Sequence, residues 1–431
     1  MLDASPQEKE VPMPASIHRS VALGAAALIL CAACSSKAAQ EEESVGADGL
    51  KTDVGVSDTE IRLAVMTDFS GPYKAGGLAL ATGNQLWADQ VNADGGICGR
   101  DIVLDTQDTT YKVDVAVPQY ATVSGEDLGI LQLGGSHILA ALKEQLTADN
   151  MLTTPAGWAS GNLDREQIML VGQSYDVEMV NGLAFMQEQG FLQDGDTIGH
   201  VWQDAEYGQN GKLAVDWYAA QHNLNVVSMP ISTTDTDMTA TVTKLKSEGV
   251  KTIAITTTPA ATGSIALQNV QQSLNAPMIG NNQAFQPPLL DDPAMVDALA
   301  DFYMVSSTAP FSADTELSKQ IAEQYTASND DEPSVGVPMG YSMGMVWEAI
   351  LNEACDAGDM TRTGVLEAKK KVTSLDTEGL TGVLDFSKDG EPSTREAFIL
   401  KPDETVEGGL SVEQDLFVSD DAKQYKTPHQ K

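Results

Sequence analysis

Residues 61–91 read IRLAVMTDFSGPYKAGGLALATGNQLWADQV, and this stretch decides the fold class. Ile61, Leu63 and Val65 alternate as in a buried strand, and a Ser-Gly-Pro turn follows at residues 70–72. Beyond the turn, helical spacing places four residues on a single face: Leu80, Gly83, Trp87 and Val91. The same spacing turns Asn84 and Gln85 away from that face. Strand, tight turn and helix form the first unit of a doubly wound α/β sheet, which either binds a ligand beyond its strand ends or simply packs.

Strand and helix patterns alternate along the rest of the chain in two series. The first series has predicted strands at 102–105, 129–133 and 151–153 and predicted helices at 113–124 and 138–148. The second has predicted strands at 197–202, 226–229, 252–256, 277–280 and 302–305, with helices at 177–189, 208–222, 238–248, 260–274, 317–328 and 341–354. An antiparallel hairpin end is predicted at 379–386. This order predicts two similar α/β lobes that face each other across a cleft.

The length and charge of the chain limit the function further. At 431 residues the chain is too long for one ordinary domain, so two domains are expected. Acidic residues outnumber basic ones 62 to 25, which gives a net charge of −37. Because phosphate recognition requires clustered Lys and Arg, no nucleic-acid partner is expected.

The N-terminus has the pattern of an export signal. A short apolar run at 21–30 follows a weakly basic start, and it is too short to span a bilayer comfortably. Ala32-Ala33-Cys34 looks like a bacterial lipobox, although Cys31 stands where leucine is usual. We therefore expect a lipoprotein signal peptide at 1–33, lipidation of Cys34 and a flexible tether at 34–54, which would anchor the protein on the outer side of the cytoplasmic membrane. A plain signal peptide cut after an alanine is the alternative, and Met13 is an alternative start.

Besides the lipidated Cys34, two cysteines remain after the expected processing. Cys98 and Cys355 both follow predicted helix ends, and an even pair in an exported protein is typical of a disulfide. Two free thiols are the alternative. No pattern of closely spaced Cys or His predicts a metal site, and no cofactor is expected.

Nothing in the sequence predicts an enzyme. Ser136 and His137 are adjacent in sequence, a spacing that does not by itself place them in a catalytic triad, and no nucleophile elbow is present. The glycines before Ser136 lack the lysine of a phosphate-binding loop.

Several motifs occur in an order that resembles a known family. They are Ser70-Gly71-Pro72, the run VNADGGICGR at 91–100, Tyr207-Gly208, and Gly379-Leu380-Thr381-Gly382 followed by Phe386. Together they are similar to the leucine/isoleucine/valine-binding solute receptors of ABC importers, over residues 56–400. The resemblance implies a type I periplasmic-binding-protein fold, with two Rossmann-like lobes joined by three hinge crossovers. The expected lobes are 55–172 plus 306–386, and 173–305 plus 387–431.

The resemblance also implies a site in the first lobe. Family members hold a ligand carboxylate with a serine and a loop of small residues, and the matching positions are Ser136, Ala156, Gly157 and Trp158. Backbone N–H groups and a hydroxyl at a helix start suit a carboxylate. Trp158 stands where the family usually has threonine, so a ring replaces a hydroxyl.

In the second lobe the matching tyrosine is Tyr207, with Tyr175 and Trp202 as possible neighbours and Phe285 at the expected cleft edge. Asn282 occupies the place of the glutamate that pairs with a ligand ammonium, and a neutral amide does not replace that charge. Asp176 or Asp68 could supply it, or both are plain capping and turn residues. The ligand could therefore be an amino acid, an amide, a carboxylic acid without an amine, or an aromatic compound.

The function that the resemblance implies is a lipid-anchored, non-enzymatic solute-binding protein of an ABC importer. It would capture a small amino acid or a related carboxylate or amide and deliver it to permease subunits in the membrane. The alternative is a receptor of the same fold that signals to a membrane partner, and an exported enzyme is less favoured.

Overall fold

The computed structural model describes residues 44–46 and 48–431, which belong to one compact unit. The expected signal peptide, the lipidation site Cys34 and most of the tether lie outside these residues. Within the described part of the chain, no helix combines the length and apolar character that a membrane span requires.

A four-stranded parallel sheet is the centre of the first lobe. Its strands are β3 (Glu60–Thr67), β4 (Asp101–Asp108), β5 (Gly129–Leu133) and β6 (Thr153–Pro155), in the order β4-β3-β5-β6. Ile61, Leu63 and Val65 pack into one core, and Ala64 and Met66 pack into another on the opposite face. The sheet is therefore covered on both sides, as its nearly unbroken apolar sequence predicts.

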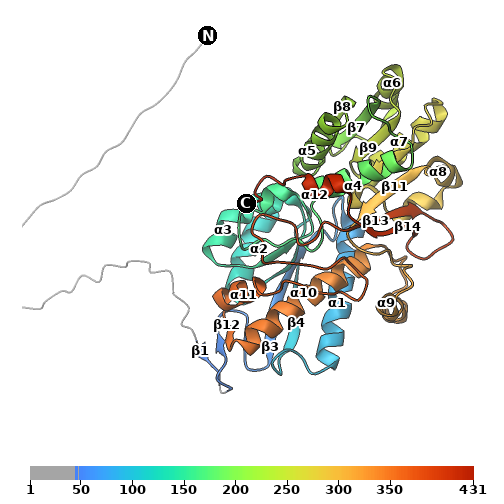
Figure 1. The fold of residues 1–431 in the computed structure, drawn as a ribbon. Helices are drawn as coiled ribbons and strands as arrows, with labels where there is room; N and C mark the ends of the chain where they lie inside the picture. Colours follow the sequence, from blue (N-terminus) through green and yellow to red (C-terminus); the bar gives the residue numbers. More distant parts are fainter. Residues whose placement is uncertain (1–43, 47) are drawn as a thin grey trace, which may run out of the picture. The chain divides into compact units, whose positions relative to one another are not determined.

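Helices from distant parts of the chain cover this sheet. On one side lie α2 (Val113–Glu126) and α3 (Ser136–Ala148), and on the other α1 (Lys74–Ala93), α9 (Glu316–Ser328), α10 (Gly336–Asp356) and α11 (Arg362–Lys369). Figure 1 shows α10, in orange, beside α1, in blue. A small sheet of β1 (Ser44–Val45), β2 (Lys51–Thr52) and β12 (Asp359–Met360) adjoins α10 and α11.

The second lobe is built on a seven-stranded sheet in the order β14-β13-β11-β10-β9-β7-β8. Its strands are β7 (Thr197–Gln203), β8 (Asn225–Ile231), β9 (Thr252–Thr256), β10 (Met278–Gly280), β11 (Phe302–Ser306), β13 (Ala397–Pro402) and β14 (Leu410–Phe417). The first five are parallel, and β13 and β14 add an antiparallel edge. The helices are α4 (Tyr175–Glu188), α5 (Glu206–Gln221), α6 (Thr239–Ser247), α7 (Pro259–Gln271), α8 (Pro293–Ala298) and α12 (Asp420–Gln424).

The chain passes between the two lobes three times, at 156–174, 307–315 and 370–396. Each lobe is therefore made of discontinuous segments. Lobe 1 receives α9, α10 and α11 only after the parallel part of lobe 2 is complete. This is the doubly wound, two-lobed α/β architecture that the sequence predicts.

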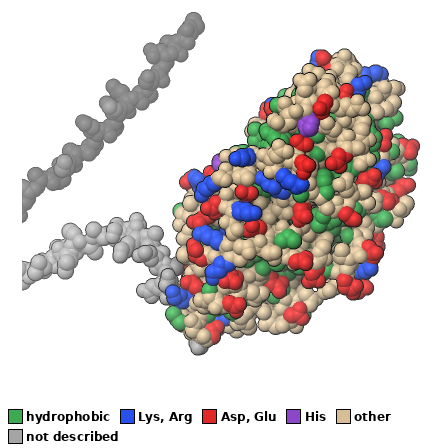
Figure 2. Space-filling model, viewed as in Figure 1, with side chains coloured by type: hydrophobic (Ala, Val, Ile, Leu, Met, Phe, Trp, Pro, Cys, Tyr) green, Lys and Arg blue, Asp and Glu red, His purple; other side chains and the backbone are tan. Residues whose placement is uncertain are grey.

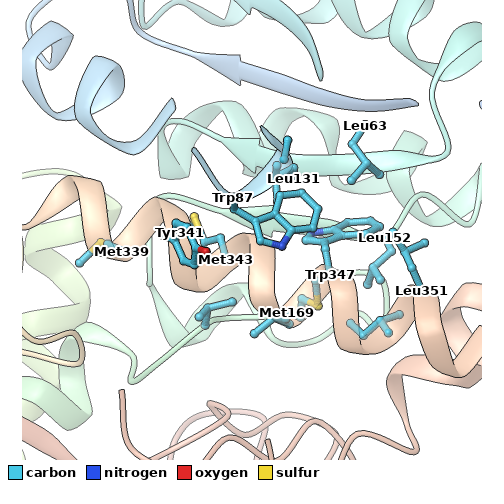
Figure 3. Close-up of a cluster of buried hydrophobic side chains, with 14 of the residues drawn as sticks. Leu63, Trp87, Leu131, Leu152, Met169, Met339, Tyr341, Met343, Trp347 and Leu351 are labelled. Carbon is cyan, nitrogen blue, oxygen red and sulfur yellow. The ribbon is translucent and has the colours of Figure 1, made fainter. Parts of the chain in front are cut away.

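Close packing of α10 against α1 and the first sheet forms the largest core (Figure 3). Trp87 and Trp347 are fully buried there, as predicted, and the Trp347 Nε1 donates a hydrogen bond to Thr154 Oγ1 at 2.8 Å. A side chain on Gly340 would place its Cβ 2.0 Å from the Leu80 carbonyl oxygen. Glycine is therefore what allows α10 to approach α1 so closely.

Asn84 corrects the predicted helical face of α1. The spacing places Asn84 away from the core, but its side chain is fully buried and donates through Nδ2 to the Gly340 carbonyl oxygen at 2.8 Å. The face is broader than the prediction because α10 covers α1 on that side. Gln85 is exposed, as predicted.

The predicted hairpin end at 379–386 is wrong as a strand assignment. This segment makes only two isolated antiparallel bridges, Thr308 with Thr381 and Leu375 with Leu384. The hairpin lies later in the chain, in β13 and β14, where the sequence prediction placed no strands.

A disulfide joins Cys98 to Cys355, the pairing that the sequence predicts. The two Cα atoms are 6.1 Å apart and the residues are separated by 257 positions. The bond connects the loop after α1 to the last turn of α10, so it ties together the two separate chain segments that form lobe 1.

Candidate ligand-binding cleft

A cavity of about 60 Å³ lies where the two lobes meet, with walls from both. Lobe 1 contributes loops after its strands and the first turns of α1, α3 and α10, among them Thr67, Asp68, Tyr73, Gly77, Tyr111 and Ser136. The wall from lobe 2 includes Tyr175, Tyr207, Asn282, Gln283 and Gln286. Because parallel strands end at one edge of a sheet, the fold brings these distant loops together.

Ser136, predicted to bind a ligand carboxylate, lines the cavity at the first position of α3. Gly135, with φ at +95°, turns the chain into this helix. The unpaired N–H groups of the first helical turn favour an anionic or carbonyl oxygen nearby. This wall can therefore accept an oxygen-bearing end of a ligand without a cationic side chain.

The neighbouring loop agrees with the prediction only in part. Ala156 and Gly157 line the cavity, and a Cβ on Gly157 would lie 2.5 Å from Ser136 Oγ. The Ala156 N–H, however, donates to the Leu133 carbonyl oxygen at 2.8 Å, so it is occupied by strand pairing. This N–H is therefore used within the sheet, and the predicted contact of Ala156 with a ligand stays a prediction.

Trp158 does not line the cavity. Its side chain is buried, and its ring packs edge-on against Tyr175 with the ring centroids 6.0 Å apart. The expected stacking of Trp158 on a ligand is therefore not supported by its position. Its ring instead supports Tyr175, which does reach the cavity.

Tyr175 and Tyr207 lie together in the wall from lobe 2, with ring centroids 4.5 Å apart. Tyr175 begins α4, and Tyr207 lies in the first turn of α5. Burial raises the pKa of both phenols well above the usual value, so both keep their protons at neutral pH. The Tyr207 hydroxyl is buried and has no hydrogen-bond partner among the described residues.

Asn282 follows β10 and lines the cavity, whereas Phe285, the other predicted residue of that loop, does not. Phe285 is 1% exposed and packs in the core of lobe 2. Trp202 is also absent from the wall, because its Nε1 donates to Ser228 Oγ at 2.8 Å on a neighbouring strand. Asn282 is therefore the one predicted residue of the loop after β10 that lines the cavity, beside Tyr175 and Tyr207 of the same lobe.

The structure places a buried carboxyl group behind Asn282. Glu178, on α4, accepts from the Asn282 Nδ2 at 2.7 Å and from the Asn281 Nδ2 at 3.0 Å. Burial raises the pKa of Glu178 to about 8, although the two amides counter this effect. Glu178 was missed because a lone glutamate within an apolar helix carries no signal of the loop it will meet.

The two aspartates considered as ammonium partners have other roles. Asp68 lines the cavity, but its carboxylate accepts the backbone N–H groups of Ser70, Gly71 and Tyr73, at 2.5 to 3.2 Å. Asp176 does not line the cavity and accepts from Ser160, Ser174 and Tyr425 hydroxyls. Both therefore act as turn and network residues, which was the plainer of the two interpretations.

Two further tyrosines complete the cavity and were not predicted. Tyr73 and Tyr111 lie with ring centroids 4.7 Å apart, and the Tyr73 hydroxyl donates to Gln203 Oε1 of lobe 2 at 3.4 Å. Each follows the end of a first-sheet strand, in the loops after β3 and β4. That position at the carboxyl edge of the sheet is the signal that could have identified them.

The electrostatic character of the cavity follows from these residues. The residues that line it include one carboxylate, Asp68, and four neutral tyrosine phenols. They include no Lys or Arg. Among the described residues no cluster of His, Cys, Asp or Glu could hold a metal ion. The site can therefore surround a small polar molecule with hydroxyls, amides and aromatic rings, under a negative rather than a positive field.

Comparison with known proteins agrees with this geometry. A family model described as periplasmic binding protein matches residues 60–405. The solved structure of a fatty acid ABC transporter substrate-binding protein from Thermomonospora curvata is 33% identical, with a TM-score of 0.86 over 89% of this chain and 99% of that one.

More distant structures share the fold. A branched-chain amino acid ABC transporter protein from Thermus thermophilus with bound valine is 16% identical, with a TM-score of 0.76 over 86% of this chain and 99% of that one. A leucine-binding protein from Thermotoga maritima is 17% identical, with a TM-score of 0.71 over 84% and 99%.

A curated relative is the chemotactic signal transduction system substrate-binding protein BasB of Halobacterium salinarum. It is 28% identical over 160 residues, which are 34% of this chain. The match spans 38% of the length of that protein.

Proposed function

Because this chain belongs to the periplasmic binding protein family, we propose that it is the extracytoplasmic solute receptor of an ABC importer. It captures a small amino acid, amide or carboxylate between its lobes and delivers it to permease subunits. The observation that carries this proposal is the cavity between the lobes, where Tyr207 and Asn282 have buried polar atoms that find no partner within the described part of the chain. Such atoms are usually satisfied, and a bound solute would satisfy them.

The size of the cavity supports a small solute. A volume of about 60 Å³ corresponds to a few water positions, since each needs at least ~10–15 Å³. The relative from Thermomonospora curvata is described as a fatty acid ABC transporter substrate-binding protein, but a long acyl chain would need the cleft of this chain to widen. We therefore place the solute of this chain among compact polar molecules.

Capture requires the lobes to move. We propose lobes of 55–172 plus 306–386 and of 173–305 plus 387–431, which open and close about the three crossings. Each lobe alone offers part of the wall, so ligand binding favours the closed arrangement. We also propose that export and a lipid on Cys34 hold the protein at the outer side of the membrane, an expectation that the Cys98–Cys355 disulfide supports because such bonds persist in oxidising compartments.

A second candidate function is signalling. The relative from Halobacterium salinarum is named for chemotactic signal transduction, so a receptor that reports its ligand to a membrane partner is the alternative. Cross-linking in membranes, followed by identification of the captured protein, separates a permease from a signalling partner.

The test of the proposed function is release of a bound solute. Mass spectrometry of small molecules freed by denaturing the purified protein should give one compact polar compound, and that compound should rebind with a 1:1 stoichiometry in calorimetry. If no solute is released and none binds, the proposed function is wrong. Fractionation of cells that carry wild type or Cys34→Ala tests the anchor, since equal membrane association of both would refute it.

A further inference from the structure

The two ends of the Asn282 side-chain amide face different surroundings. The Nδ2 donates to Glu178 Oε1 at 2.7 Å, behind the cavity wall, whereas Oδ1 is buried without a partner among the described residues. Asn282 itself lines the cavity and is 4% exposed. An amide is ordinarily ambiguous, because either end can be turned toward a ligand. Here the carboxyl group behind it removes the ambiguity once it is ionised, since a carboxylate can only accept, whereas the protonated acid that prevails below a pKa of about 8 can also donate.

The neighbouring residue holds Glu178 in place. The Asn281 Nδ2 donates both to Glu178 Oε2 and to the Tyr175 carbonyl oxygen, at 3.0 and 2.9 Å. Its Oδ1 accepts from Thr256 Oγ1 at 3.1 Å. Because the Tyr175 carbonyl oxygen can only accept a hydrogen bond, the orientation of the Asn281 amide is fixed independently of the ligand. Glu178 therefore receives donors on both oxygens, from a loop that also carries Asn282.

We propose that ionised Glu178 is a positioning residue that turns Asn282 Oδ1 to the cleft, so that the cleft then selects ligands with an N–H donor, whether amide or ammonium. The inference rests on the proposed function and names the class of its solute. Asn282 then does not simply lack the charge of a family glutamate. Glu178, one layer deeper, makes the amide an acceptor.

Among the described residues, no cation is among the groups that shift the pKa of Glu178. The titratable groups that act on it are Asp176 and Tyr175 of its own helix and Tyr207 of α5. A ligand N–H bound to Asn282 Oδ1 polarises the amide and strengthens the Nδ2–H bond to the carboxylate. Ligand binding and ionisation of Glu178 thus favour each other. Measurements at pH 9 keep the carboxyl group ionised, because burial raises its pKa to about 8.

The test uses three small probes with four carbon atoms each, of which butanamide and butanoate have the same shape. Butanamide carries an N–H donor and is neutral, butylamine carries one and is cationic, and butanoate carries none. Calorimetry with the full chain at pH 9 should show butanamide or butylamine binding at least tenfold more tightly than butanoate. The ratio between the two donor-bearing probes distinguishes an amide solute from an ammonium solute.

The variant Glu178→Gln assigns the preference to this residue. A glutamine can donate as well as accept, which frees Asn282 to present either end, so the preference for butanamide over butanoate should fall to less than threefold. A purely structural role would weaken all probes alike and leave the ratio unchanged. Glu188→Gln, the same substitution at an exposed position of α4, should keep the wild-type ratio.

Failure of the inference and failure of the proposed function are distinguishable. Equal affinity of wild type for butanamide and butanoate, or a released solute without an N–H group, overturns the inference and leaves the solute receptor intact. An unchanged ratio in Glu178→Gln also overturns it. The wild-type comparison does not depend on whether the variant folds. Absence of any released solute and of any probe binding overturns the proposed function and the inference together.

Discussion

At the scale of single residues, the cavity depends on polar atoms that the protein leaves unpaired. Tyr207 shows this most simply, because its ring packs on Tyr175 while its hydroxyl finds no partner among the described residues. The ring and the hydroxyl can therefore be tested separately.

Replacement of Tyr207 by phenylalanine should weaken binding of the released solute by roughly 3- to 10-fold, the effect of one lost hydrogen bond. Replacement by alanine should weaken it further, since a wall of the cavity is lost. Calorimetry measures both, and thermal melting should show that Tyr207→Phe stays folded. Tyr325→Phe loses a hydroxyl that donates to Asp331 O outside the cavity, so it serves as the matched control. Wild-type affinity in Tyr207→Ala would mean that the cleft is elsewhere.

Glu178 predicts how the stability of the ligand-free protein depends on pH. The unfolded carboxyl group ionises near pH 4.5, whereas the folded one keeps its proton until about pH 8. The folded state therefore binds more protons across this window, so the free energy of unfolding from this group is greatest below pH 4.5 and falls as the pH rises to 8. Urea denaturation at pH 5 and pH 8 should show a decline, on the order of 3 kcal/mol from this group, that Glu178→Gln removes. An identical decline in that variant, with Glu188→Gln as the control, would contradict the assignment.

At the scale of elements, the crossing of α1 and α10 is set by glycine. Gly340→Ala should destabilise the protein by about 1–3 kcal/mol, because the added Cβ meets the backbone of Leu80, which has little freedom to shift. In Gly125→Ala, at the end of α2, the Cβ would have no atom within 4 Å, so this variant should be neutral or slightly stabilised. Chemical denaturation compares the two. Equal stability would show that the helices can move apart without loss.

Most elements could be predicted from the sequence because their periodicity is strong and local. The alternating Ile61, Leu63 and Val65 gave β3, and the glycine-proline turns gave the loop edges where the cavity lies. Asn84 could not be predicted, because its burial depends on α10, some 250 residues away, whose Gly340 carbonyl oxygen it meets.

The residues that line the cavity could be predicted where they directly follow a strand. They could not be predicted where tertiary packing determines the direction of the side chain. Ser136 and Asn282 follow strands and line the cavity, as does Gly157. Trp158 also follows a strand, yet its ring turns to Tyr175, a contact made only after the chain has crossed to the other lobe. The role of Glu178 could not be predicted from the sequence, because its partners come from the loop after β10, more than 100 residues later in the chain.

At the scale of the whole molecule, the Cys98–Cys355 bond closes a loop that contains all the parallel strands of lobe 2. Removing it in the double variant Cys98→Ser/Cys355→Ser should lower the free energy of unfolding by about 2–5 kcal/mol. In denaturation experiments, reductant should lower the free energy of unfolding of wild type to that of the variant. The variant itself should have the same stability with and without reductant. Stability of the variant equal to oxidised wild type would refute this role.

The net charge of −37 predicts a dependence on salt. Figure 2 shows acidic side chains spread across the visible face, while Lys and Arg gather on part of it. Self-repulsion weakens as salt screens it, so the melting temperature should rise by roughly 2–5 °C between 10 mM and 0.5 M sodium chloride. A melting temperature that falls with salt would instead indicate that attractive ion pairs dominate.

The discontinuous construction of lobe 1 constrains the order in which the molecule can mature. A chain that emerges N-terminus first presents the first sheet with Trp87 uncovered, because the helix that buries it, α10, is about 250 residues away in the chain. Only after the parallel strands of lobe 2 have followed can α10 dock and Cys355 reach Cys98. Lobe 2 therefore has the chance to fold while lobe 1 is still waiting for its last helices, and until then the early apolar surface needs protection from other emerging chains.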